Sequence, residues 1–392
     1  MKRKHIILNF ITISLLSISG YSADLDIKAF GTISGVYNNN GNYIYRKDIF
    51  QKDGSSNDLS FETDTLIGLQ TIVNINENYS FALQGIVNNN CDDKIEAKID
   101  WGYLKYDSNE NIIIKLGKIR TPYYRNSENL NIGYSNLMIR ESVEVYGQVP
   151  FSSYNGVEFI YSDIISRYFY TIQAGYGAEE LSVPIHSLNQ KANVDVNNLY
   201  AVNLTFGTDA LQLRTTYLNA DITASNISID QLFTGLRAFG FNDLANRYEF
   251  KNTNSEYLGF GLFIDYKNFI FSSEYAQRRI PSFFADTHGY YITFGYNFNR
   301  IIPFITYSKS KMDTATYEAN TVSNELNALL HAQNLAQTSK LIGIKYYVNE
   351  NVDLKFQYEN IKPIGEFGSY YLSSLQYPQT LNVFSFAMDF IF

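Results

Sequence analysis

Several residue types and patterns that characterise other protein classes are scarce in this sequence. It has one cysteine, one tryptophan and seven prolines in 392 residues. Cys91 has no partner, which excludes a framework of disulfides. Beyond the N-terminal region, no stretch reaches the roughly eighteen consecutive apolar residues of a membrane helix. Acids outnumber lysines and arginines by 39 to 31, so we expect no basic surface for nucleic acid.

The residues of catalytic and metal sites are equally sparse. Outside the N-terminal region the histidines are His186, His288 and His331. None of them lies at the spacing of a zinc site or of a Ser-His-acid arrangement. No glycine-rich phosphate-binding loop is present. We therefore expect no enzymatic activity, no metal and no cofactor.

Aromatic residues, by contrast, are abundant, with 33 tyrosines and 28 phenylalanines. The chain ends on a strict alternation whose large apolar members are Phe384, Phe386, Met388, Phe390 and Phe392. This pattern predicts a strand with one face toward hydrocarbon and one toward water. Closing such strands into a barrel within a lipid bilayer removes the exposed edge. The alternative is the buried last strand of a soluble sandwich.

The terminal aromatic residue resembles the assembly signal of bacterial outer-membrane β-barrels. That resemblance implies that Met388, Phe390 and Phe392 are recognised by the barrel assembly machinery. The N-terminus agrees with export, because Lys2-Arg3-Lys4 precede an apolar segment at residues 6–18. We expect a signal peptide at residues 1–22, cleaved after Ser22 or Ala23, and a single barrel domain at residues 23–392.

Alternating residues and turn-forming clusters predict about sixteen strands, the even number found in single-chain bacterial barrels. The predicted strands are 26–37, 63–75, 79–88, 94–106, 112–120, 154–161, 167–176, 198–206, 211–218, 256–266, 269–277, 289–298, 302–310, 340–348, 352–361 and 380–392. The fold class is therefore all-β, a transmembrane antiparallel β-barrel.

The lengths of the connections support this topology. After even-numbered strands the links are short, and three of them contain Asn-Glu-Asn, which suits tight reversals. After odd-numbered strands they are mostly long, at 38–62, 121–153, 177–197, 219–255, 311–339 and 362–379. A membrane barrel has this asymmetry, with short periplasmic turns and long external loops. Two of the long links have helical spacing, at Ile229, Leu232, Phe233 and Leu236 and at Val322, Leu326, Leu329 and Leu330.

Alternation within strands also predicts which side chains face lipid. In 352–361 the outward residues are Val352, Leu354, Phe356 and Tyr358, and the inward ones are Asp353, Lys355, Gln357 and Glu359. In 94–106 the outward residues are Ile95, Ala97, Ile99, Trp101 and Tyr103, and the inward ones are Glu96, Lys98 and Asp100. Charges on the inner face predict a hydrated interior and not a packed core.

The link at residues 121–153 is the third external loop and the most informative one. Its sequence around Tyr134, Arg140, Val143-Glu144-Val145-Tyr146 and Pro150-Phe151 resembles a family of proteobacterial porins. Its position resembles that of the constriction loop in sixteen-stranded Gram-negative porins, which folds into the lumen. The resemblance implies a bacterial outer-membrane location, contact with lipid and a homotrimer.

A wide barrel is an open aqueous channel unless something narrows it, and a charged, aromatic loop inside the lumen would do so. The candidate constriction residues are Arg120, Arg125, Glu128, Tyr134, Arg140, Glu141, Glu144, Tyr146 and Phe151. Loop acids facing wall bases, for which Lys98, Lys115 and Arg214 are candidates, would set a transverse field that selects solutes. The alternative is a surface loop whose salt bridges are internal.

Three functions fit these features. The first is a water-filled channel for passive diffusion of small hydrophilic solutes and ions. The second is a substrate-preferring channel, in which Arg120, Arg125 and Arg140 line a path for small anions. The third is an adhesin or surface antigen whose long external loops bind a host or a phage.

Overall fold

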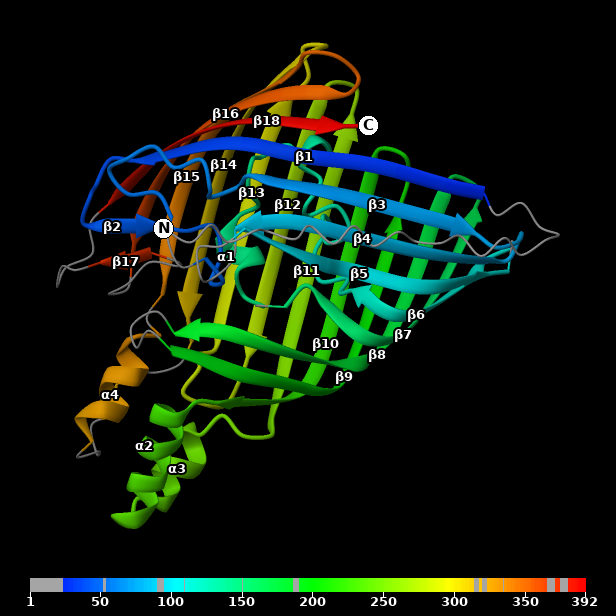
Figure 1. Cartoon of the computed structure of the whole chain (residues 1–392). Coiled ribbons are helices and arrows are strands. Elements are labelled where there is room, and N and C mark those ends of the chain that lie inside the picture. Colours follow the sequence, from blue (N-terminus) through cyan, green and yellow to red (C-terminus); the bar gives the residue numbers. More distant parts are fainter. Residues whose placement is uncertain are drawn as a thin grey trace, which may run out of the picture.

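The computed structural model of the chain describes residues 24–51, 54–89, 95–108, 110–149, 151–185, 190–313, 317–318, 323–333, 335–364, 371–373 and 380–392. Over these ranges sixteen antiparallel strands form a closed barrel (Figure 1). The strands are β1 (Asp24–Asn38), β3 (Leu66–Asn74), β4 (Tyr79–Asn89), β5 (Ile95–Asp107), β6 (Ile112–Arg120), β7 (Ser153–Ile165), β8 (Tyr168–Ile185), β9 (Gln190–Gly207), β10 (Leu211–Ser225), β11 (Thr253–Tyr266), β12 (Phe269–Arg279), β13 (Thr287–Tyr296), β14 (Ile301–Met312), β15 (Gln337–Tyr347), β16 (Val352–Pro363) and β18 (Leu381–Ile391). The sixteen predicted strands are thereby confirmed.

The first and last strands close the barrel. β1 pairs with β18 on one side and with β3 on the other. The amide of Ala29 donates to the carbonyl of Phe392 at 2.8 Å, and the amide of Phe392 donates to the carbonyl of Ala29 at 2.8 Å. The ladder therefore continues to the last residue and leaves no open edge, as a barrel in lipid requires.

The outer face of the barrel is a belt of exposed apolar side chains at alternate strand positions. Members from around the barrel are Ile67, Leu69, Leu116, Leu204, Leu213, Phe260, Phe294, Ile305, Ile342, Phe356 and Phe384. Aromatic pairs border the belt near the short turns, among them Tyr79–Tyr106, Tyr168–Phe206 and Phe269–Tyr296. Such a surface is stable against hydrocarbon and not against water. The prediction of lipid-facing residues in β16 is confirmed, because polar positions 353, 355, 357 and 359 are buried on the inner side.

The two ends of the barrel differ in the way predicted from the link lengths. At one end the strands join through short turns; in two of these, Oδ1 of Asn76 accepts the amide of Asn78 and Oδ1 of Asn349 accepts that of Asn351. The other end carries the long links, with α2 (Ile227–Ala238), α3 (Asn242–Tyr248) and α4 (Asn324–His331) beyond the strands (Figure 1). A small sheet of β2 (Tyr43–Tyr45) and β17 (Tyr371–Ser373) lies there too. No helix of the described residues is long and apolar enough to cross a membrane.

Two predictions about the sheet are wrong. The link expected at 177–197 is mostly strand, because β8 and β9 continue to Ile185 and from Gln190. In this extension the alternation is inverted. Leu181 and Val183 point inward and pack against a cluster of buried apolar residues that includes Phe233, and Ser182 is exposed. Above the bilayer the outer face meets water and the inner face meets the loop helices, so the pattern that identifies a lipid-facing strand is reversed.

The second wrong prediction concerns Trp101 and Tyr103, which point into the lumen. The register between β4 and β5 shifts at Asp100, so that Trp101 lies opposite Gln84 and Ile99 opposite Gly85. One extra residue in a strand moves every later side chain to the opposite face. Ile95, Ala97 and Ile99 keep the predicted outward direction because they precede the bulge.

Several parts of the sequence prediction lie outside the described residues: the signal peptide with its cleavage site, Cys91, Pro150, His186 and Val322. The two helical segments predicted from spacing correspond to α2 and α4. The helix α1 (Val143–Tyr146) and the 3-10 helix η1 (Gly133–Ser135) lie within the third loop and were not predicted. In Figure 1, α1 lies inside the barrel, in contact with β12, β13 and β14.

Candidate functional site

The third loop, residues 121–152, leaves β6 and runs along the inner wall of the barrel. Near its start, the carbonyl of Pro122 accepts hydrogen bonds from Arg214 at 3.0 Å and Thr216 at 3.3 Å, both on β10. On β12, Glu274 accepts the amide of Arg125 at 2.9 Å and the hydroxyl of Tyr146 at 2.8 Å. The predicted inward fold of this loop is confirmed.

A buried lysine of β15 holds the deepest part of the loop. Nζ of Lys345 donates to the carbonyl of Tyr134 at 2.5 Å and to that of Asn136 at 3.1 Å. The same nitrogen lies 3.1 Å from a carboxylate oxygen of Asp353, and the two side chains are 2% and 0% exposed. A lysine so deeply buried is stable only with an anionic partner and with its remaining protons bound.

A second lysine repeats this arrangement one strand further. Nζ of Lys355 donates to the carbonyl of Gly133 at 2.6 Å and to that of Met138 at 3.3 Å. Asp389 of β18 lies 2.9 Å from it and accepts the hydroxyl of Thr32 at 2.5 Å. A Cβ at Gly133 would lie 2.0 Å from the Asp389 carboxylate, so only glycine allows the loop to approach so closely. The interior beside β15, β16 and β18 is therefore packed, and the prediction of a hydrated interior is wrong there.

Helix α1 is fixed to the wall by Glu144. Its carboxylate accepts hydrogen bonds from the side chains of Ser339 and of Gln337, the latter at 2.8 Å. The Glu144 residue is 1% exposed. A Cβ at Gly289 on β13 would lie 2.1 Å from the Glu144 carbonyl, so glycine is required at this contact as well. Glu144 therefore anchors the loop, and the expectation that it faces the passage is wrong.

Arg140 joins the third loop to β18 and to the first external loop, which connects β1 to β3. Its guanidinium forms an ion pair with Asp64 and donates to the hydroxyl of Ser385 at 2.5 Å. The ring of Tyr45 lies 5.2 Å away, at a distance suited to a cation–π contact. The ion pair holds the loop on the side of the lumen opposite to β12.

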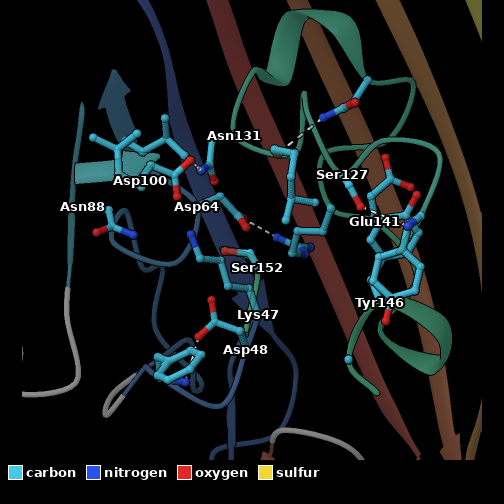
Figure 2. Close-up of a pocket in the computed structure, with 18 of the residues that line it drawn as sticks. Lys47, Asp48, Asp64, Asn88, Asp100, Ser127, Asn131, Glu141, Tyr146 and Ser152 are labelled. Atoms are coloured by element: carbon cyan, nitrogen blue, oxygen red, sulfur yellow. Dashed lines mark hydrogen bonds and ion pairs between the residues drawn. The ribbon is translucent and has the colours of Figure 1, made fainter. Parts of the chain in front are cut away.

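A cavity of about 260 Å³ lies between the third loop, the first external loop and strands β1, β3, β4 and β5. Figure 2 shows Asp64, Asp100 and Asn131 on one side of this cavity and Ser127, Glu141 and Tyr146 on the other. The charged residues that line it are Lys47, Asp48, Asp64, Lys98, Asp100, Arg120, Arg140 and Glu141. We call it the charged cavity.

Two arginines of the charged cavity are each neutralised by an aspartate. Arg120 pairs with Asp100, and both side chains are less than a tenth exposed. Asn131 donates to the same carboxylate at 2.9 Å. Arg140 pairs with Asp64 as described above. Because each arginine already has an anion in contact, neither is a free site for an anionic solute.

Four charged residues of this cavity remain without an ion pair in the described part of the chain. They are Lys47, Lys98, Asp48 and Glu141. Glu141 accepts a hydrogen bond from Asn126 at 2.7 Å. Burial raises the pKa of Glu141 to about 7, and the nearby Glu274 carboxylate adds to the shift. The charge of the cavity therefore changes near neutral pH.

The structure also locates the other predicted residues. Lys115 pairs with Glu158 of the wall at 2.9 Å and with Glu128 of the loop at 3.6 Å. Among the described residues, the contact between Lys115 and Glu128 is the one case in which a loop acid lies opposite a predicted wall base. Arg214 binds a loop carbonyl, and Lys98 lines the charged cavity. The exposed Arg125 lies over the ring of Phe263 at 4.9 Å.

The predicted aromatic residues of the loop serve its packing. Tyr146 stacks on Tyr124 at 4.1 Å, and Tyr134 packs edge-on against Tyr347 at 5.7 Å. Phe151 packs against Tyr123 at 5.6 Å and lines the charged cavity.

Sequence reasoning missed the residues that fix the loop. The sequence analysis predicts Lys355 only as an inward position of 352–361, and it assigns no role to Asp64, Lys345 and Asp389 within the predicted strands 63–75, 340–348 and 380–392. One pattern in the sequence could have identified them, because charged residues recur at inward positions of the three neighbouring strands β15, β16 and β18. An inward charge that repeats on adjacent strands predicts pairing across the sheet.

Comparison with known proteins identifies the fold. No family model matches the sequence, and no curated protein matches it. Among solved structures, the barrel is similar to an anion-selective porin from Comamonas acidovorans, with 9% identity, a TM-score of 0.57 and coverage of 95% of this chain and 100% of that chain. It is similar to Salmonella typhi OmpF in complex with daunomycin, with 14% identity, a TM-score of 0.56 and coverage of 94% and 98%. The trimer form of OmpT of Vibrio cholerae gives 10% identity, a TM-score of 0.56 and coverage of 95% and 100%.

The chain thus has the fold of porin-like barrels of the bacterial outer membrane. The belt of apolar side chains on its outer face agrees with that location.

Proposed function

We propose that the chain forms a water-filled channel for the passive diffusion of small hydrophilic solutes and ions. One observation carries this proposal: the third loop is fixed inside the lumen and borders a cavity lined by charged groups. A loop that served only surface recognition would have no need of buried lysines that hold its carbonyls against the inner wall. Charges around a narrow wet passage bias the local potential by several kT and so act on passing ions.

A channel that prefers small anions is the less favoured reading. Arg120 and Arg140, two of the three arginines that would line its path, are each paired with an aspartate. The unpaired groups of the charged cavity comprise two lysines and two acids, so they supply little net charge when Glu141 is ionised.

The experiment is single-channel recording of the refolded protein in planar bilayers. We expect steady unitary currents in potassium chloride, without saturation by a particular solute, and swelling of liposomes in isotonic solutions of small sugars. A barrel without any unitary current would refute the channel and leave the adhesin or antigen function. Saturation of the current by one solute would support the substrate-preferring channel.

We further propose a homotrimer that the barrel assembly machinery inserts through the C-terminal strand. The trimer form of the similar OmpT supports an expectation of this assembly. Migration in a native gel before and after heating tests it. A single species of monomer size in the unheated sample would contradict it.

A further inference from the structure

A second cavity of about 230 Å³ lies at the long-loop end of the barrel, beside the third loop. We call it the apolar cavity. Its walls come from the extensions of β8, β9 and β10, from α2 and α4, and from residues 280–284. The lining includes Val183, Val194, Ile222, Phe250, Ile280 and Phe283.

Such a lining is unexpected in a passage for polar solutes. Water inside a cavity needs two to four polar partners, and an apolar cavity of about 150 Å³ stays dry and binds benzene. The apolar cavity is also lined mainly by apolar side chains and is somewhat larger, and it is open to solvent. A ring-sized apolar group would therefore gain free energy by entering it from water.

Contacts beside the cavity hold its walls apart. Asn226 caps α2 by accepting the amides of Ser228 and Ile229, and its side chain donates to Gln190 and to the carbonyl of Lys191, both at 3.0 Å. Buried Phe233 packs α2 on Phe283 at 6.3 Å. Because the helix is fixed at both places, the cavity cannot close by a small shift of α2.

The two cavities adjoin. Ile49 of the first external loop and Val149 and Phe151 of the third loop line both of them. Polar groups lie at the border: Arg278 donates to the carbonyl of Gln148 at 2.6 Å. A molecule in the apolar cavity would thus have charged and polar groups next to one of its ends.

From this arrangement we propose that the apolar cavity binds small amphipathic solutes. The site takes an apolar group of about the size of one aromatic ring, and the solute's polar end faces the charged cavity. The inference rests on the proposed function in that the solute reaches the site through the external mouth of the channel. It adds to that function a class of solute that the charged cavity alone would not select.

The test uses benzoate and acetate, which carry the same head group and differ in the apolar part. Each is added to potassium chloride during single-channel recording, and its half-blocking concentration is measured. Benzylamine and methylamine form a second pair with the opposite charge. We expect the aromatic member of at least one pair to block at a concentration about tenfold or more below that of its small partner, as burial of a ring implies.

Two variants remove the site by different means. Ala224→Phe fills the cavity, and Val194→Thr adds a hydroxyl to its wall with little change of volume. Both should bring the aromatic blocker to within about twofold of its small partner. Ala97→Phe, on the exposed outer face of β5, is the matched control and should retain the difference. Shifts in gel migration on heating report whether each variant is folded.

The current in potassium chloride alone reports the channel, and the block reports the site. Equal half-blocking concentrations within both pairs for the wild-type protein would overturn the site and leave the channel intact. Selective block that persists in both folded variants would also overturn it. If the protein carries no current, saturation-transfer NMR with benzoate and with benzylamine on the refolded barrel decides. Transfer to either probe that Ala224→Phe abolishes supports the site. No transfer to either probe for wild type, or transfer that persists in folded Ala224→Phe, refutes it.

Discussion

Replacement of Lys355 by methionine is the most informative perturbation of the third loop. The variant removes the donor that holds the carbonyls of Gly133 and Met138. It also leaves the Asp389 carboxylate, 1% exposed, with the Thr32 hydroxyl as its neighbour in place of a cation. Breaking a buried ion pair by removing one partner costs about 3–5 kcal/mol.

The size of this cost decides whether the variant releases the third loop or unfolds the barrel. A difference of about 1.4 kcal/mol is a factor of ten in an equilibrium. The loss therefore favours release of the loop by a factor of roughly a hundred to several thousand. The barrel itself is held by its closed ladder of strands, in which the third loop takes no part. We expect the loop to leave the wall while the barrel remains folded.

Single-channel recording measures this response. Lys355→Met should give a larger unitary conductance and more frequent current fluctuations than wild type. Adding Asp389→Asn removes the uncompensated charge, so the double variant should fluctuate less than the single one. Lys340→Met, at an exposed position of the neighbouring strand β15, is the matched control. If folded Lys355→Met matched wild type in conductance and in fluctuations, the proposed anchoring would be refuted.

Three further changes test other parts of the structure. Gly133→Ala should also release the loop, because its Cβ would overlap the Asp389 carboxylate; normal conductance of the folded variant would argue against the close contact. As the pH falls from 8 to 6, Glu141 gains a proton, and the loss of a negative charge should lower the preference for cations, measured as a reversal potential in a salt gradient. Glu141→Gln should remove that pH dependence, and its persistence would assign it to another group. Deleting Phe392 should reduce the folded, heat-modifiable barrel in the outer membrane, because the last residue pairs with β1; unchanged levels would contradict the role of the terminal residue.

The strands could be predicted because apolar and polar residues alternate along a strand that has one face toward lipid and the other toward the interior of the barrel. In β18, Phe384, Phe386 and Met388 face hydrocarbon, while Ser385 and Ala387 are buried on the inner side. The rule fails where the environment changes along one strand. In β8 it inverts above the bilayer at Leu181, and in β5 it shifts at the bulge formed by Asp100.

The position of the third loop could be predicted, but its contacts could not. Its place after β6 and its resemblance to a constriction loop indicated the lumen. The partners of its charges are distant in sequence: Glu144 meets Ser339, and Gly133 meets Lys355. A single sequence does not reveal which inward residue lies opposite which loop residue. An acid that anchors a loop and an acid that lines a passage therefore look alike.

If the third loop narrows the lumen, a barrel without this loop should have a higher conductance. Residues 134–148 are replaced by a short glycine-serine linker, and the unitary current of the refolded variant is compared with that of wild type in the same salt. We expect the conductance to rise at least about twofold, because a barrel of this width is otherwise open. An unchanged conductance in a folded variant would show that the third loop does not narrow the lumen.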